Sequence, residues 1–324
     1  MKAIQFSTFG GPDVLETVNV DVPKPNEQEA LIEVHRVGVN YADTARRRGQ
    51  YVVPTPLPFI PGAEVAGVVK EVGAGVKNVE PGTRVVTLTG SGGYAEYVAA
   101  DARGLIPIGD ALDLSTAAAL PLQGLSAYHV LKTMGQLAEG ETVLVHAAAG
   151  GVGSIAVQLA KLHGAAKVIA TASTEEKLTD AKRMGADIGI NYTQEGWEKE
   201  VLEATGGKGV DIALEMAGGD IFEKTLRVLG SFGRLIIFGS ASGEPSKFNA
   251  MRLMEKNQSV IGFFLPQIMR KPELMQSSLE TLFAHLQKGE LELQIGHSFS
   301  LEDAAHVHEL MEGRKTKGKI ILEV

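Results

Sequence analysis

Short runs of apolar and β-branched residues, separated by glycine and proline, fill the first third of the chain. Clear examples are residues 30–34, 65–72 and 83–87. Runs of this length, bounded by turn residues, are typical of β-strands. The pattern therefore predicts a β-rich domain over residues 1–121.

From about residue 122 to residue 256 the pattern changes to strands that alternate with helices. The apolar run 142–145 breaks into glycines and continues with apolar positions at helical spacing, and the next β-prone run, 167–171, follows at βαβ distance. Further strand patterns lie at 211–215 and 234–238. This alternation predicts a doubly wound parallel sheet that binds its ligand at the carboxyl ends of the strands.

The remaining segment has too few elements for a domain of its own. It carries a helical pattern at 272–287 and a closing strand at 318–323. We therefore expect residues 257–324 to rejoin residues 1–121, with the second domain inserted between them. The predicted fold class is α/β.

The turn after residues 142–145 has the spacing of a dinucleotide-binding fingerprint. Ala148-x-Gly150-x-x-Gly153 supplies a tight turn, a close approach of backbone amides to a pyrophosphate, and close packing of helix on strand. The phosphates would lie at the positive end of the helix. The predicted contacts are Ala149, Gly150, Gly151, Val152 and Gly153. Glycine-rich turns also connect strands to helices in folds that bind no nucleotide, so this alternative stays open.

The end of the next strand indicates which nicotinamide cofactor is used. An acidic residue there would bind a ribose 2′-hydroxyl and repel a 2′-phosphate, but the chain has Ser173, followed by Lys177. A hydroxyl and an ammonium favour NADPH. The alternative is an ordinary helix start, with Glu175 and Glu176 in the first turn and a solvated Lys177.

Composition excludes several classes of protein. The net charge of −8 argues against non-specific binding to nucleic acid or to an anionic membrane. The chain has no cysteine, which removes disulfides, thiolate nucleophiles and thiolate zinc ligands, and its eight histidines are scattered. We expect no metal site. No membrane-length apolar run or signal-peptide pattern is present, so we expect a cytoplasmic protein.

Several ordered segments together resemble the zinc-independent quinone oxidoreductases of the medium-chain dehydrogenase/reductase superfamily, over nearly the whole chain. The matching segments are residues 38–43, 62–67, 92–97, 123–128, 146–153 and 190–192. The resemblance implies a GroES-like catalytic domain (1–121 and 257–324) and a Rossmann-type NADPH domain (122–256). In the related zinc alcohol dehydrogenases a cysteine takes the place of Asn40 and a histidine that of Ala63.

The resemblance also implies an activity. Without a Lewis acid, a reaction that generates alkoxide charge loses several kcal/mol of stabilisation. Quinones and α,β-unsaturated carbonyls spread the incoming charge by conjugation, so a few hydrogen-bond donors are enough. The expected activity is NADPH-dependent reduction of a quinone or an enone.

Site residues follow from the same resemblance. Asn40 and Asp43 would form the polar floor of the pocket, and Tyr51 would face the substrate; these three are the candidate catalytic residues. The alternatives are a loop Asn and Asp that form their own turn and a tyrosine that is only packed. The proton donor is left open between Tyr51 and water.

The implied cofactor contacts beyond the glycine turn come from many parts of the chain. Tyr192 resembles the tyrosine that joins the lysine at the adenosine 2′-phosphate. For the aromatic residues, plain core packing is the alternative, and for Gln123 and Ser126 it is helix capping. The set comprises Tyr41, Gln123, Ser126, Ser173, Lys177, Tyr192, Phe238, Gly239, Ser240, Phe263, Phe264, Leu265 and Arg314.

Two other functions remain open at this point. Arg46, Arg47 and Arg48 follow the pocket loop and would suit a trans-2-enoyl thioester reductase that binds an acyl carrier, although such a triplet is usually a solvated helix face. A non-enzymatic NADPH-binding structural or sensor protein is the second. The family often pairs cofactor domains through an edge strand, for which residues 256–262 are the candidate, so we expect a homodimer.

Overall fold

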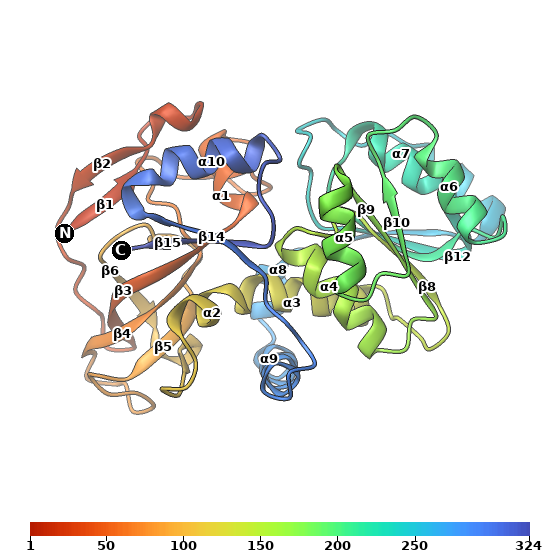
Figure 1. The fold of residues 1–324 in the computed structure, drawn as a ribbon. Coiled ribbons are helices and arrows are strands. Elements are labelled where there is room, and N and C mark those ends of the chain that lie inside the picture. The colour runs from red at the N-terminus through yellow and green to blue at the C-terminus, as the bar shows by residue number, and fades with distance from the viewer. The chain divides into compact units, whose positions relative to one another are not determined.

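The computed structural model describes all residues from 1 to 324 and divides the chain into two compact units (Figure 1). The first unit comprises Met1–Leu122 and Leu293–Val324, and the second comprises Gln123–Glu292. The chain thus leaves the first unit, builds the whole second unit, and returns to the first.

The first unit is built on a seven-stranded, mainly antiparallel sheet, in which six strands form one path and β6 lies off it. Its order is β14-β15-β3-β4-β5-β7, and β6 also pairs with β3. A separate two-stranded sheet joins β1 to β2. The strand bounds are β1 Lys2–Gln5, β2 Glu16–Asn19, β3 Glu29–Val39, β4 Glu64–Val72, β5 Arg84–Leu88, β6 Tyr97–Asp101, β7 Ile106–Pro107, β14 Ile295–Ser300 and β15 Lys319–Glu323.

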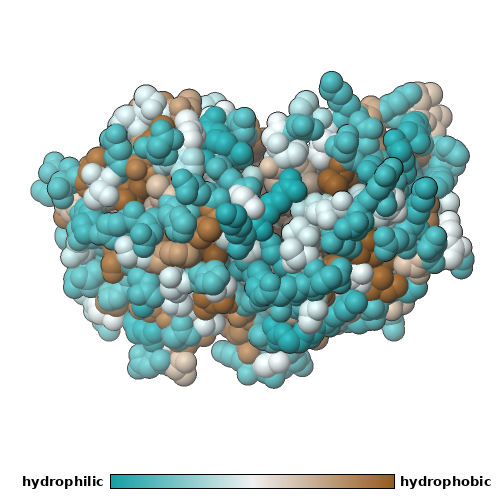
Figure 2. Space-filling model, turned by 45° about the horizontal axis from the view of Figure 1, so that its top comes forward, coloured by the Kyte–Doolittle hydropathy of each residue, from teal (hydrophilic) through white to brown (hydrophobic).

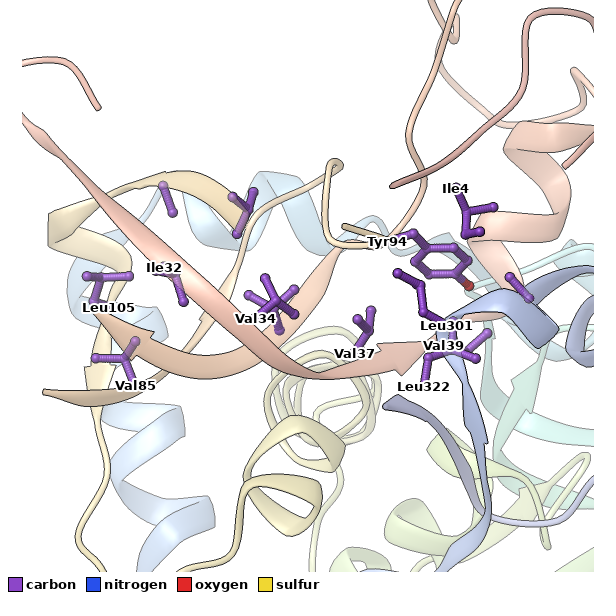
Figure 3. Packing of buried hydrophobic residues seen from close by; sticks show 14 of the residues in the cluster. Ile4, Ile32, Val34, Val37, Val39, Val85, Tyr94, Leu105, Leu301 and Leu322 are labelled. Atoms are coloured by element: carbon purple, nitrogen blue, oxygen red, sulfur yellow. The ribbon is translucent and has the colours of Figure 1, made fainter. Parts of the chain in front are cut away.

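Short helices complete this unit. The α-helices are α1 Tyr41–Arg47, α2 Leu114–Ala119 and α10 Ala304–Glu312, and the 3-10 helices are η1 Pro12–Val14, η2 Ala102–Gly104 and η5 Leu301–Asp303. Aliphatic side chains of β3, β4 and β15 form the core together with Tyr94, whose ring lies close to Ile4 and Leu301 (Figure 3). The strand patterns predicted a β-rich unit because β1, β3, β4, β5, β6 and β15 each place apolar residues in this core.

The second unit is a six-stranded sheet in the order β10-β9-β8-β11-β12-β13, and every neighbouring pair is parallel. The strand order reverses between β8 and β11, as in doubly wound folds. The strands are β8 Thr142–Val145, β9 Lys167–Ala172, β10 Ile188–Asn191, β11 Val210–Glu215, β12 Leu229–Ile237 and β13 Ser259–Gly262. The helices are α3 Pro121–His129, η3 Val130–Met134, α4 Gly151–Leu162, α5 Glu175–Arg183, α6 Trp197–Ala204, α7 Gly219–Val228, η4 Ala250–Lys256, α8 Leu265–Met269 and α9 Pro272–Gln287.

The expected return to the first unit after residue 256 needs correction. The second unit continues to Glu292, because β13 adds a sixth strand beside β12 and both α8 and α9 follow it within the same unit. Only β14, η5, α10 and β15 rejoin the first unit. The helix at 272–287 therefore exists as predicted but belongs to the other unit.

No helix combines the length and apolar character needed to cross a bilayer. On the face drawn in Figure 2, hydrophobic residues are scattered among hydrophilic ones. The large apolar side chains with the highest exposed fractions are Val52, Phe232, Met254 and Met251.

Candidate functional site

The carboxyl ends of the parallel strands collect most of the predicted cofactor residues at one edge of the second unit's sheet. Because all six strands point the same way, the segments that follow them meet at this edge. Residues 149–153 follow β8, Ser173 follows β9, Tyr192 follows β10, 238–240 follow β12 and 263–265 follow β13.

The turn after β8 leaves the start of α4 open to an anion. Gly150 is the N-cap residue, and no side chain caps the helix there. A Cβ on Gly153 would lie 2.2 Å from the Ala147 carbonyl oxygen, and one on Gly151 would lie 2.0 Å from the Gln123 side chain. The Gly153 position therefore requires glycine, because the clash there is with backbone, whereas at Gly151 the Gln123 side chain would have to move. The uncapped amides and helix dipole fit a pyrophosphate.

The next helix along the chain begins differently. Thr174 caps α5, and its hydroxyl accepts a hydrogen bond from the Lys177 backbone N–H over 3.3 Å. Glu175 and Glu176 occupy the first turn. The ordinary helix start considered as an alternative is thus present, and it leaves the half-buried side chains of Ser173 and Lys177 at the predicted cofactor edge.

His146, directly after β8, is buried and connects β9 to α7 at this edge of the sheet through hydrogen bonds. Its Nδ1 and Nε2 each lie 2.7 Å from a threonine hydroxyl, of Thr171 and Thr225. The Thr225 hydroxyl donates to the Ile221 carbonyl, so it accepts from Nε2–H, and in the neutral ring Nδ1 then accepts from the Thr171 hydroxyl. Burial lowers the pKa of His146 to about 4, which keeps the ring in this form.

Glu215, at the carboxyl end of β11, is a buried residue that the sequence analysis did not single out. Its Oε1 accepts from the backbone N–H groups of Ala217 and Gly218, whereas Oε2 has no partner. Burial raises the pKa of this carboxyl above its ordinary value. A charged residue that ends an apolar strand was the signal that could have identified it.

In the first unit, Asn40 and Asp43 form a capping box at the start of α1. The Asn40 backbone N–H donates to Asp43 Oδ2 over 2.9 Å, and the Gly62 N–H donates to Asp43 Oδ1 over 3.3 Å. Burial raises the pKa of the Asp43 carboxyl. Asp43 therefore forms local structure, as the alternative had it, with both oxygens used by backbone donors.

The Asn40 side chain belongs to a buried polar cluster that the sequence analysis missed. Lys319 Nζ donates to Asn40 Oδ1 over 2.8 Å and to Glu64 Oε2 over 2.7 Å, and the Leu122 N–H donates to Glu64 Oε1 over 2.6 Å. Lys319 and Glu64 are 1% and 0% exposed. An ammonium at this carbonyl repels a metal cation, so the Asn40 position does not fit a zinc ligand.

The arginines after the pocket loop do not form a free basic face. Arg47 is fully buried and pairs with Glu312. The Arg46 guanidinium lies 4.1 Å from the centre of the Tyr51 ring, and the Arg48 guanidinium lies 5.6 Å from that of Tyr41. Burial raises the pKa of the half-buried Tyr51. The three arginines therefore form neither a solvated helix face nor a free basic surface for an acyl carrier.

Besides Tyr41 in α1, three predicted contacts lie away from the strand ends. Gln123 and Ser126 are buried in α3. Ser126 lies inside that helix and does not cap its start. Arg314 follows α10 in the first unit and has a positive φ of 57°.

A β-rich unit that is completed by the C-terminal strands, together with an inserted parallel sheet whose glycine turn opens a helix, defines a two-domain nicotinamide-dependent dehydrogenase or reductase. Family models agree with this class. Residues 26–110 match the alcohol dehydrogenase GroES-like domain, and residues 151–280 match the zinc-binding dehydrogenase domain.

Relatives and solved structures narrow the class further. The chain is 36% identical to quinone oxidoreductase 1 of Escherichia coli, over 98% of each chain, and 35% identical to the quinone oxidoreductase of Pseudomonas aeruginosa, over 99% of each. It covers all of the E. coli quinone oxidoreductase structure in complex with NADPH, with a TM-score of 0.95 and 34% identity. The chain belongs to the quinone oxidoreductase family of the medium-chain dehydrogenase/reductase superfamily, which confirms the resemblance noted in the sequence.

Proposed function

We propose that this protein is an NADPH-dependent oxidoreductase that reduces quinones or α,β-unsaturated carbonyl compounds. The observation that carries the proposal is the uncapped, glycine-lined start of α4, placed beside four other strand ends that carry predicted cofactor residues. The E. coli relative, solved with NADPH, supports this choice of cofactor.

The residues at this edge suit each part of the cofactor. In the proposal, the backbone of residues 150–153 holds the pyrophosphate, because its amides are free of side-chain caps. Ser173, Lys177 and Tyr192 surround the 2′-phosphate, and the segments 238–240 and 263–265 line the nicotinamide. Bound NADPH supplies the hydride. Gln123, packed against Gly151, fixes the shape of the phosphate turn.

The first unit supplies the groups that act on the acceptor. Asn40 offers an amide N–H to the carbonyl oxygen that gains negative charge, and such a donor stabilises the transition state. Tyr41, Tyr51 and Arg314 are proposed contacts of cofactor or acceptor, while Asp43 fixes the loop that carries Asn40. Protonation of the product is left to Tyr51 or to water.

Turnover by the purified protein tests the proposal directly. NADPH oxidation measured against a quinone, an enone and a crotonyl thioester should be fastest with the quinone or the enone and at least about tenfold slower with NADH, because an ammonium and a hydroxyl at a 2′-phosphate contribute about 1.4 kcal/mol or more. Faster turnover of the thioester would favour the acyl reductase. Tight NADPH binding without turnover of any acceptor would favour the sensor role.

We also propose a homodimer joined along β13, the last strand of the second unit's sheet. Its outer edge has unpaired backbone groups, which are a template for another strand. Phe232, in the neighbouring β12, is 71% exposed, and Met251 and Met254 in η4 are 67% and 68% exposed. In the proposal, these exposed apolar side chains form part of the association surface. The cytoplasm stays the predicted location.

Light scattering should therefore give twice the 34.4 kDa mass of one chain. Phe232→Asp combined with Met254→Asp should yield monomers at micromolar concentration, because two carboxylates would then be buried in the interface. The control is Val22→Asp, an exposed apolar position of the first unit, which should stay dimeric. A monomeric wild-type protein would contradict the proposal.

A further inference from the structure

The Asn40 side chain is held in one orientation by its neighbours. Its Oδ1 accepts from Lys319 Nζ over 2.8 Å, and its Nδ2 donates to the Gly38 carbonyl over 2.9 Å. An ammonium has donors only, so the amide oxygen must face Lys319, and a flipped amide would place N–H groups against N–H groups. One Nδ2–H remains beyond the bond to Gly38.

The backbone around this contact is closely fitted to the lysine. A Cβ on Gly38 would lie 2.6 Å from Lys319 Cε, 2.6 Å from Glu64 Oε2 and 2.5 Å from the Ala118 carbonyl oxygen. Only glycine at position 38 lets β3 lie this close to the Lys319 side chain. The ammonium is therefore confined between Glu64 and Asn40, with almost no exposure to water.

The buried charges of Lys319 and Glu64 are arranged as a dipole beside the Asn40 side chain. Glu64 balances the charge of Lys319, so the pair is a dipole whose positive end lies at the Asn40 carbonyl. In a buried setting, a hydrogen bond from a cation polarises the amide that accepts it, and a polarised amide is a stronger donor through its N–H. Neutral amides without such a partner lack this effect.

We propose that Lys319 is a positioning residue for quinone or enone reduction: it fixes and polarises the Asn40 amide, so that the remaining Nδ2–H is aimed and strengthened as a donor to the acceptor's carbonyl oxygen. The inference rests on the proposed function. Lys319 itself touches neither cofactor nor acceptor in this scheme, and Glu64 keeps its charge balanced inside the unit.

The test uses the double variant Lys319→Met with Glu64→Gln, which removes both charges and so leaves no lone buried ion. We expect kcat for a quinone to fall about 10- to 100-fold. This is at or below the loss that follows the complete removal of one transition-state hydrogen-bond donor. The Kd for NADPH, measured by fluorescence titration, should stay within about threefold, since a donor used in the transition state does not act on ground-state binding.

A spectroscopic readout separates positioning from general loss of structure. In protein labelled with ¹⁵N-asparagine, the Asn40 side-chain signal is assigned by its absence in Asn40→Asp. In the double variant this signal should move and broaden, because the amide loses its fixed partner. The control pair is Arg36→Met with Glu323→Gln, an ion pair that also involves β15, which should leave both the signal and kcat unchanged.

Two results would overturn the inference: a folded double variant with wild-type kcat, or an Asn40 amide signal that is the same in wild type and double variant. A wild-type protein that turns over no acceptor would instead overturn the proposed function, and the amide signal alone would then decide whether Lys319 positions Asn40. The two failures are thus distinguishable.

Discussion

Lys319→Met alone is expected to lower the free energy of unfolding by about 3–5 kcal/mol, because it leaves the Glu64 carboxylate buried without its counter-ion. Glu64 would keep only the bond from the Leu122 N–H. The Asn40 side-chain oxygen would lose its hydrogen bond from the Lys319 ammonium as well. Urea unfolding at pH 7, followed by circular dichroism, measures the change.

A matched control removes an exposed lysine of the same sheet. Lys70 on β4 pairs with Glu33 on β3, and its side chain is 46% exposed, so Lys70→Met should change stability by less than about 1 kcal/mol. Adding Glu64→Gln to Lys319→Met should restore part of the loss, since the lone charge disappears. Equal losses for Lys319→Met and Lys70→Met would show that the buried pair has no special role in stability.

The second large effect is expected at Gly153. Gly153→Ala places a methyl carbon 2.2 Å from the Ala147 carbonyl oxygen and 2.8 Å from Ala148 Cα. Both are backbone atoms, and Ala147 already has a positive φ of 49°, so the turn has little freedom to move away. We expect a loss of about 2–4 kcal/mol in stability and a rise of at least about tenfold in the Kd for NADPH.

Thermal unfolding with and without NADPH reports both effects. A ligand that binds only the folded state raises the melting temperature, so the wild type should gain stability with NADPH and Gly153→Ala should gain little. Gly109→Ala is the control, because a Cβ there meets nothing within 4 Å. An unchanged response of Gly153→Ala to NADPH would exclude the turn after β8 as the pyrophosphate site.

The elements that the sequence predicted well are those with strong local signals. The run 142–145, the glycines after it and the helix that follows appear as β8 and α4, because apolar periodicity and turn chemistry agree over this stretch. The return to the first unit was misplaced because β13 has only four residues, and its partner β12 precedes it by a loop and a 3-10 helix. Local patterns do not report which sheet a short strand joins.

The buried charges were missed for a different reason. Lys319 and Glu64 are 255 positions apart, so no spacing rule connects them. Each is the charged first residue of a strand and is followed directly by apolar residues, which is a signal of buried pairing, but the sequence does not identify the partner. Arg47 is a similar case. A triplet of arginines in the sequence predicts an exposed helix face, yet Arg47 is buried and paired with Glu312.

The insertion of one unit into the other also governs the order of folding during synthesis. The sheet of the first unit needs β15 beside β3, and β15 leaves the ribosome only after the whole second unit has been made. The second unit is continuous in sequence, so it can fold while the sheet of the first unit still lacks β15 and its neighbour β14. Until then the part of the β3 edge that pairs with β15 stays open, and the buried Glu64 gains its counter-ion Lys319 only when β15 arrives.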